Sequence, residues 1–564
     1  MRQAGLVFVY GAIQELGLLP ALVETTQARA QEAAGAASRR LRRSRAGTLQ
    51  AQFLTWLLAP LVDGVQRPWH VVGPTAATLA VWTGRHYTFW ALELMLRGLM
   101  QSALSQDLGA ALARCYDQVW YAPREPEPPL EAMVYYLDSH DKRLWTHAAV
   151  PCGRVKGQTA PCWRQMFIHG RHGHALYSRT FPGDVKIPAV AGEIVDDFEA
   201  AVGRAVVQVL VVDREGVSLP LFEALAARGT AIVTLLKANQ YTGAQDFEDL
   251  SEAQSLRDPR TGEITHQVAE GWLRGATGQR WRCAVAQDVE RERLVVFVTT
   301  VSPTAEPNIL APARWYLGRW GAQENPFRDL NALVGLEHNF GVKRKRAVAN
   351  RVQARRQAKW EQHQKGLATR LGAQAKRIGT LQARVDREEE RLRQFVAGLT
   401  GRRLQPRGTA RRQAQQTRIT ARLKKWQAQL TALQEQQTAM EQKLQAVQAD
   451  LAALPAEAPL WEVDAEKDQI VTHLKIATAN AVRWAQANYF QAEAPRLRPE
   501  TVQRQFLNLD GWVQDTHTNR TVWLSIPPDT PWQGEVEQAC IHFNQRHIRT
   551  LEGKLLQVHV AYCK

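Results

Sequence analysis

A seven-residue repeat of apolar residues over 351–455 constrains this chain more than any other feature. The repeat is carried by Leu367, Leu371, Ile378, Leu381, Val385 and Leu392, then by Ile419, Leu423, Trp426, Leu430 and Leu433, and finally by Met440, Leu444, Val447, Leu451 and Leu454. Such spacing places apolar side chains along one stripe of a helix, and a second helix must cover that stripe. Gly and Pro residues between Thr400 and Gly408 interrupt the repeat. The sequence therefore predicts two long helices that reverse there into an antiparallel coiled-coil hairpin.

The positive charge of the chain is concentrated in the same region. The whole chain has a formal net charge of +16. Residues 341–460 contain 26 Lys and Arg against 9 Asp and Glu, so the remainder of the chain is close to neutral. A basic excess confined to one segment favours a surface that binds a polyanion such as nucleic acid. The alternative is that these charges are only the solvated outer faces of the two helices.

Two aspartates follow apolar runs that are typical of buried strands. Asp138 ends a run that begins at Val134, and Asp213 ends a near-continuous run that begins at Val206. A third carboxylate, Glu324, lies in a polar segment with helical character. Converging carboxylates of this kind can bind a pair of divalent cations for in-line attack on a phosphodiester. Each Asp alone is also compatible with an ordinary strand end, because Asp is common in turns.

Composition and pattern divide the 564 residues into several regions, and the expected fold class is mixed α/β. The regions are a helical N-terminal domain at 1–130, a mixed sheet covered by helices at 131–241 and 313–340, a β-rich insertion at 242–312, the basic hairpin at 341–460 and a C-terminal α/β module at 461–564. The sequence assigns no chemistry to the first and last of these regions.

Individual elements follow from local periodicity. Residues 133–138 and 142–149 are predicted to form a hairpin, 163–169 and 174–181 a second strand pair, and 205–213 and 230–236 two buried strands around a helix at 219–228. The chain has no uncharged apolar run of about 18 residues, so no membrane span is expected. Its six cysteines form no CxxC pair, which favours a reducing compartment.

The order of these features resembles the DDE transposases of bacterial insertion sequences. A strand that ends at Asp138, a strand that ends at Asp213, a β-rich insertion and a helix with Glu324 follow one another as in that family. The family's third carboxylate lies in a Tyr-Arg-Glu-Lys motif, and Tyr316, Arg319 and Glu324 stand here in that order. Four residues rather than three separate Arg319 from Glu324.

The basic end of the motif also differs. Asn331 occupies the position of the family's lysine, and Arg328 is the nearest basic residue. The resemblance covers roughly residues 133–340.

The resemblance implies a ribonuclease-H-like catalytic core and a DNA transposase. Such an enzyme cleaves strands at transposon ends and transfers them into target DNA. Asp138, Asp213 and Glu324 would be the catalytic residues and would bind two Mg²⁺ ions, with Mn²⁺ able to substitute. One ion would activate water, or later the freed 3′-hydroxyl, and the other would stabilise the leaving oxygen.

The resemblance also implies a DNA partner and a cellular location. Tyr316, Arg319 and Arg328 would contact DNA phosphates. The partner would be double-stranded DNA, namely the transposon ends and the target, bound by a homodimer. The expected location is the bacterial cytoplasm at the nucleoid, without membrane association.

Three further side chains have two interpretations each. His140 lies two positions after Asp138 and would point the same way on a strand. It would be a metal neighbour, an acid–base helper or a plain hydrogen-bonded histidine. Trp272 and Trp281 of the insertion would either stack on a flipped base or simply be buried within the insertion.

Two other functions are compatible with the sequence. The first is a catalytically inactive, transposase-derived protein that only binds nucleic acid, because the third motif is altered. The second is a structural coiled-coil protein. Metal-dependent cleavage of transposon-end DNA distinguishes the enzyme from the first alternative. The second alternative predicts no nuclease activity and weak, sequence-independent DNA binding.

Overall fold

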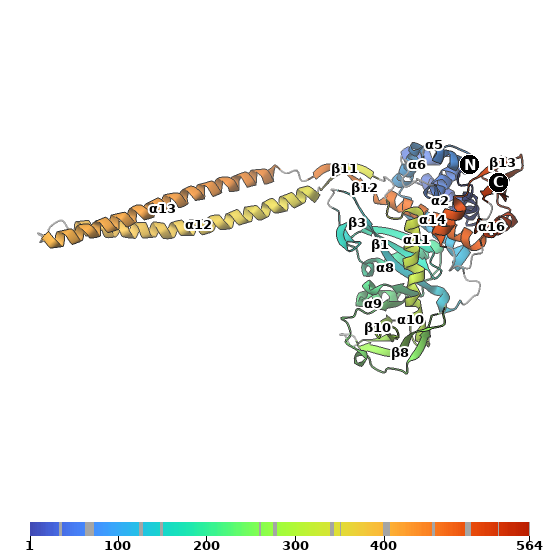
Figure 1. The fold of residues 1–564 in the computed structure, drawn as a ribbon, viewed down its shortest axis with the longest axis horizontal. Helices are drawn as coiled ribbons and strands as arrows, with labels where there is room; N and C mark the ends of the chain where they lie inside the picture. Colours follow the sequence, from blue (N-terminus) through green and yellow to red (C-terminus); the bar gives the residue numbers. More distant parts are fainter. Residues whose placement is uncertain are drawn as a thin grey trace. The chain divides into compact units, whose positions relative to one another are not determined.

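The chain forms two compact units in a computed structural model (Figure 1). The structure describes residues 1–564 except 33–35, 63–70, 72, 123–127, 147–149, 259–260, 275–278, 339–342, 350, 399–405, 454–456, 491–497, 528–529 and 563–564. The first unit consists of residues 1–145, 151–344 and 463–564, and the second of residues 146–150 and 345–462. Helices and a mixed sheet share the first unit, so the predicted mixed α/β class is confirmed.

The described part of residues 1–121 is helical. Its elements are α1 (Leu6–Glu15), α2 (Leu18–Glu32), α3 (Ala36–Arg43), α4 (Ala46–Leu58), α5 (Gly73–Thr83), α6 (Phe89–Gln101) and α7 (Ser105–Tyr116), with a 3₁₀ turn at Ala59–Leu61 and a π turn at Asp117–Tyr121. Gly17 divides α1 from α2 because it adopts a left-handed conformation with φ 65°. In the described part of the chain, no single helix has the length and apolarity to cross a membrane, although the bent pair α1 and α2 together does.

A mixed sheet of ten strands forms the centre of the first unit as far as the structure describes it. Its strands are β1 (Val134–Arg143), β2 (Cys152–Val155), β3 (Gln158–Gly170), β4 (Ala175–Pro182), β5 (Val209–Val212), β6 (Ala231–Leu235), β7 (Gln254–Arg257), β8 (Ile264–Arg274), β9 (Arg280–Asp288) and β10 (Leu294–Thr299). The strand order is β2-β3-β1-β5-β6-β10-β9-β8-β7, and β4 pairs with β3. β1 is antiparallel to β3 and parallel to β5, and β5 is parallel to β6.

Helices connect the parallel strands. α8 (Ile187–Val202) precedes β5, and α9 (Leu219–Ala227) joins β5 to β6. All four residues of β5 are buried, as expected for a central strand of a covered sheet. The strand predicted at 230–236 and the helix before it are confirmed, whereas the strand predicted at 205–213 forms only over Val209–Val212.

The β-rich insertion continues the central sheet. β7, β8, β9 and β10 form an antiparallel series, and β10 pairs with β6. Val268, Ala284 and Phe297 of the insertion share one hydrophobic cluster with Val211 of β5. The insertion is thus held by the same core as the strands that carry the two aspartates.

The predicted hairpin of residues 133–138 and 142–149 is wrong. β1 continues to Arg143, and the polar stretch from Asp138 to Asp141 pairs with β3 at every position. Lys142 is fully buried, and the charge of its ammonium group is compensated there because it donates to Asp468 at 2.6 Å. Asp468, far along the chain, therefore allows the charged Lys142 to lie in β1, where the sequence resembles a turn. Residues 147–149 of the predicted second strand lie outside the described residues.

Three further helices complete this region. α10 (Leu310–Leu317), a π turn at Trp320–Glu324 and α11 (Asn325–Val334) follow the sheet, which confirms the predicted helical character. α14 (Ala465–Asn488) is buried over most of its length and packs against α1, α7, α11 and β4. It therefore joins the N-terminal helices to the sheet.

The C-terminal segment closes on the N-terminus. Its elements are α15 (Pro499–Val502), a π turn at Gln503–Leu507, β13 (Gly511–Asp515), β14 (Asn519–Ile526), α16 (Gln533–Gln545) and β15 (Leu555–Tyr562). The Phe543 ring of α16 lies 5.9 Å from the Phe8 ring of α1. A glycine is required at position 11, because a Cβ there would lie 2.4 Å from the Phe543 ring.

The second unit contains two long helices. α12 (Arg351–Ala397) and α13 (Pro406–Ala452) have 47 residues each, and β11 (Lys343–Ala349) pairs with β12 (Glu457–Val463) at their base. Gln374 Nε2 donates to Leu433 O at 3.2 Å, and Gln427 Nε2 donates to Glu389 Oε1 at 2.9 Å. As the residue number rises along α12 from 374 to 389, the number of its partner on α13 falls from 433 to 427. The two helices are therefore antiparallel.

Five of the predicted repeat positions are buried in this unit. Leu367, Val385, Leu423, Leu430 and Val447 are buried, and the two long helices are confirmed. Most of the predicted reversal at 400–408 lies outside the described residues.

Candidate active site

Two parallel strands place Asp138 and Asp213 side by side. Leu137 of β1 pairs with Val212 of β5, and each aspartate is the next residue of its chain segment. Neighbouring strands are about 4.8 Å apart, so the two side chains start from adjacent positions. Asp213 ends its strand, whereas Asp138 lies within β1, which continues toward Arg143.

One guanidinium bridges the two carboxylates. Arg319 Nη1 lies 3.7 Å from Asp138 Oδ2 and 3.4 Å from Asp213 Oδ1. The two oxygens are therefore separated by no more than the sum of these distances, about 7.1 Å. The side chain of Asp213 is 35% exposed and that of Asp138 18% exposed, so both can be reached from solvent.

Tyr316 orients the more exposed carboxylate. Its hydroxyl donates to Asp213 Oδ1 at 3.1 Å, and the Arg319 guanidinium lies 5.6 Å from its ring. Burial raises the pKa of Tyr316 above its ordinary value, so the hydroxyl stays protonated and remains a donor. The ring packs 5.2 Å from Phe297 of β10, which ties α10 to the sheet.

The main chain around the aspartates is also fixed. The Asp213 carbonyl accepts hydrogen bonds from the Thr234 hydroxyl at 3.0 Å and from Gly216 N at 2.6 Å. Ser139 N donates to Asp138 Oδ1 at 2.7 Å. Both carboxylates are thus held by the sheet rather than by a loose loop.

The other two predicted site residues are Glu324 and Arg328. Glu324 ends the π turn after Arg319, but its side chain lies outside the described part of the chain, so its convergence with the aspartates stays a prediction. Arg328 is half exposed and pairs with the adjacent Asp329 at 3.9 Å.

The carboxylates match part of a site for hard divalent cations. Asp138 and Asp213 supply oxygen ligands of the type that Mg²⁺ and Mn²⁺ prefer, from adjacent positions of the sheet. Among the side chains that the structure describes, no group of three or more His, Cys, Asp or Glu could hold a metal ion. Glu324 is outside that set, so the third ligand is untested.

Phe327 anchors the helix that follows Glu324. Its ring lies 5.0 Å from the Phe167 and His169 rings and 5.7 Å from the His140 ring. These contacts dock the start of α11 on β1 and β3. The sequence analysis missed Phe327, although an aromatic residue three positions after Glu324 on a helix was an available signal.

His140 has a packing role in this structure. Burial lowers its pKa to about 4, so the ring is neutral near pH 7. Its Nε2 has no hydrogen-bond partner among the described residues, and the ring stacks on Phe327. These contacts do not favour the acid–base role considered for it.

The two insertion tryptophans line a cavity of about 610 Å³ beside α9. The Trp281 ring meets Phe222 edge-on at 4.9 Å, and the Arg280 guanidinium lies 5.2 Å from the Trp272 ring. Trp281 is therefore partly packed, while Trp272 forms part of the cavity rim. Both interpretations of these residues stay open.

Comparison with models of known protein families and with curated proteins found no match to this chain.

Proposed function

We propose that this protein is a DDE-type DNA transposase that cleaves strands at transposon ends and transfers them into target DNA. The observation that carries the proposal is the placement of Asp138 and Asp213 on adjacent parallel strands, within reach of one arginine. Tyr316 and Arg319, the first two residues of the resemblance motif, both contact these carboxylates.

The topology supports a ribonuclease-H-like core. β4, β3 and β1 form an antiparallel series, and β1 is followed in the sheet by β5 and β6, which are parallel to it. An antiparallel meander continued by two helix-connected parallel strands is the arrangement expected of such a core. The strands at the centre of that order are the ones that carry the aspartates.

The chemistry follows from the side chains. Asp138, Asp213 and Glu324 would hold two divalent cations, which would supply an activated hydroxyl and stabilise the leaving oxygen. Tyr316 keeps the Asp213 carboxylate in one orientation. Arg319 offsets part of the negative charge of the two carboxylates and would turn toward the phosphodiester when cations take over that role.

The second unit would provide an extended DNA-binding surface. We propose that α12 and α13 form a coiled coil, because several of their repeat positions are buried while most of the described basic residues remain exposed. Phosphate neutralisation by such a surface is independent of sequence.

The test is metal-dependent cleavage by full-length protein. The substrate is duplex DNA copied from the sequences that flank the gene, with Mg²⁺ or Mn²⁺ added. Wild-type protein should nick the strand at a defined position, and Asp213→Asn should abolish nicking while duplex binding stays within about twofold. Asp510→Asn, an exposed aspartate before β13, is the control. Nicking by Asp213→Asn at the wild-type rate would exclude this site.

A further inference from the structure

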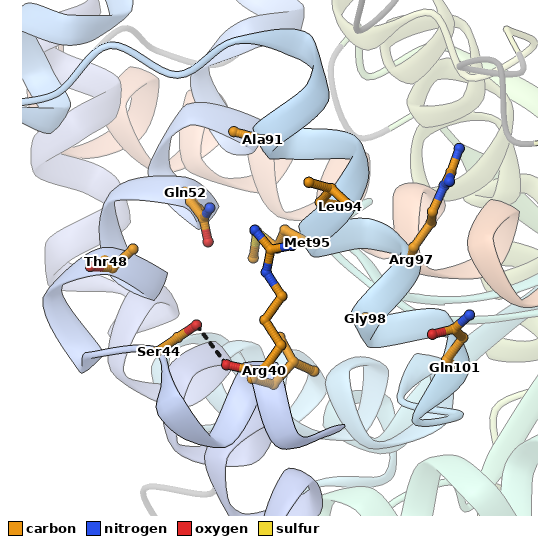
Figure 2. Close-up of a pocket in the computed structure, with 11 residues that line it drawn as sticks. Arg40, Ser44, Thr48, Gln52, Ala91, Leu94, Met95, Arg97, Gly98 and Gln101 are labelled. Carbon is orange, nitrogen blue, oxygen red and sulfur yellow. Dashed lines mark hydrogen bonds between the residues drawn. The ribbon is translucent and has the colours of Figure 1, made fainter. Parts of the chain in front are cut away.

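A polar pocket lies between α3, α4 and α6, on helices that the catalytic proposal does not use. Its volume is about 430 Å³. Its polar lining includes Arg40, Ser44, Thr48, Gln52, Arg97 and Gln101, and the buried side chains of Leu41 and Met95 form its apolar floor. Figure 2 shows Arg40 reaching from α3 into the space between α4 and α6, and Arg97 extending from α6.

The walls of the pocket are closely packed. Leu41 of α3 lies over Gly98 of α6, where a Cβ would come within 3.3 Å of the leucine side chain. Only Ser44 and Arg45 separate α3 from α4, and the Ser44 hydroxyl donates to Arg40 O at 3.1 Å. The pocket is thus a built feature of three packed helices.

Two arginines, Arg40 and Arg97, line the pocket, and further arginines lie next to it in the sequence. Arg39, Arg40, Arg42, Arg43 and Arg45 are exposed on and just after α3, and within the described residues none of them forms an ion pair. None of the lining residues is acidic.

The nearest acid on α6 is already engaged. Glu93 is buried, where it accepts from Arg97 Nε at 2.9 Å and from Lys467 Nζ at 2.7 Å. Because Glu93 holds Arg97 through Nε alone, the terminal nitrogens of that half-exposed guanidinium remain available. No carboxylate lines the pocket, and Glu93 offsets only the charge of Arg97 on its rim, so the surface keeps a net positive charge.

We propose that this pocket, lined by Arg40 and Arg97, binds the phosphate backbone of duplex DNA at a place separate from Asp138 and Asp213. The inference rests on the proposed function for its choice of polyanion. Guanidinium groups pair with phosphates in a two-pronged geometry, and hydroxyl and amide donors such as Thr48 and Gln52 complete such contacts. Exposed Trp90, on the same helix as Arg97, offers an apolar contact for sugars.

The test measures duplex affinity as a function of salt. Full-length protein carrying Arg40→Gln and Arg43→Gln is titrated with a fluorescent 30-base-pair duplex of arbitrary sequence, and Arg291→Gln with Arg293→Gln is the control with equal charge loss. Each lost phosphate contact should reduce the slope of log K against log salt by about 0.9, so the double variant should lose about 1.8. The control slope should not change.

Further arms separate the alternatives. Arg40→Lys with Arg43→Lys should keep the salt slope but weaken binding, because lysine retains the positive charge without the two-pronged donor geometry of the guanidinium. A wild-type slope for the Gln variant would overturn the proposal, as would equal competition by polyglutamate of matched charge.

Nicking assays separate this proposal from the catalytic one. At saturating protein the Arg40 and Arg43 variant should still nick DNA, whereas Asp213→Asn should not. An unchanged slope with inactive Asp213→Asn would reject the pocket alone. A reduced slope with active Asp213→Asn would reject the catalytic site alone.

Discussion

At the scale of single residues, the sheet edge that carries Asp138 and Asp213, here called the carboxylate edge, depends on an arginine as well as on its two acids. Asp138 and Asp213 would repel each other across adjacent strands, and Arg319 offsets that repulsion from 3.7 and 3.4 Å. A cation that binds the two aspartates must compete with this guanidinium. In the proposed mechanism, the displaced arginine would meet the negative charge of a phosphodiester.

Buried histidines make the fold sensitive to acid. His169 is fully buried, both ring nitrogens lack partners within the described residues, and burial lowers its pKa to about 3. Because the folded pKa lies below the unfolded value of about 6.5, stability is complete above pH 6.5 and falls as pH decreases toward the folded pKa.

His169→Leu should reduce this sensitivity. Between pH 7.5 and pH 5 the wild-type protein should lose about 2 kcal/mol through His169, and the variant should not lose that part. Urea unfolding at the two pH values measures the difference. His517→Gln, at an exposed position, should behave as wild type. Equal pH dependence of His169→Leu and wild type would contradict the expectation.

Phe327 should act as a positioning residue for Glu324. Phe327→Ala removes the ring that docks α11 on β1 and β3, so cleavage should fall at least tenfold and the Mg²⁺ concentration for half-maximal rate should rise. Phe327→Leu should restore most of the activity. Duplex affinity should not change in either variant. A lower rate with an unchanged Mg²⁺ requirement would argue against positioning of a metal ligand.

At the scale of elements, the hairpin should contribute a separable part of DNA affinity. β11 and β12 pair at its base, so residues 351–455 can be replaced by a short Gly-Ser linker. The shortened protein should bind duplex more weakly and with a shallower salt slope, because the phosphate contacts of α12 and α13 are gone. A folded deletion variant with the wild-type slope would identify the hairpin as a spacer or dimerisation device.

Elements with strong local patterns could be predicted from the sequence, and those that depend on distant partners could not. The seven-residue repeat was sufficient for α12 and α13, and the apolar run before Asp213 was sufficient for β5. The course of β1 was missed because burial of Lys142 depends on Asp468, which lies on α14 far along the chain. The polar sequence of α14 gave no sign that its charges are paired inside the protein.

The candidate site divides in the same way. The apolar runs identified the end of β5 and the buried first half of β1, although β1 continues past Asp138, and the resemblance motif supplied Tyr316 and Arg319. Their contact with Asp213 depends on the packing of α10 against β10, which local periodicity does not contain.

At the scale of the whole molecule, α14 joins regions that are remote in sequence. Lys467 pairs with Glu93 of α6 at 2.7 Å, Asp468 with Lys142 of β1 at 2.6 Å, and Arg483 with Asp329 of α11 at 3.0 Å. Buried pairs of this kind fix which elements pack together, and loss of one partner leaves an uncompensated charge.

Asp468→Asn should therefore destabilise the first unit by about 3–5 kcal/mol. Removing both charges with Lys142→Met and Asp468→Leu should recover most of that loss, since apolar replacement of a buried pair is often tolerated. Hydrogen exchange should show amides of α7 and β3 becoming labile together in the single variant. Loss of hydrogen-exchange protection only near residue 468 would contradict the expectation that α7, β3 and α14 open together.

The position of α14 has a consequence for synthesis. The carboxylate edge is encoded before residue 325, yet the helix that supports β1, β4 and α11 emerges from the ribosome only after both arms of the hairpin. Until then Lys142 has no acid to pair with, and the sheet has no cover on that side. On the function proposed above, a nascent or prematurely terminated chain would carry the basic hairpin before its sheet is complete, and DNA cleavage would be confined to finished copies.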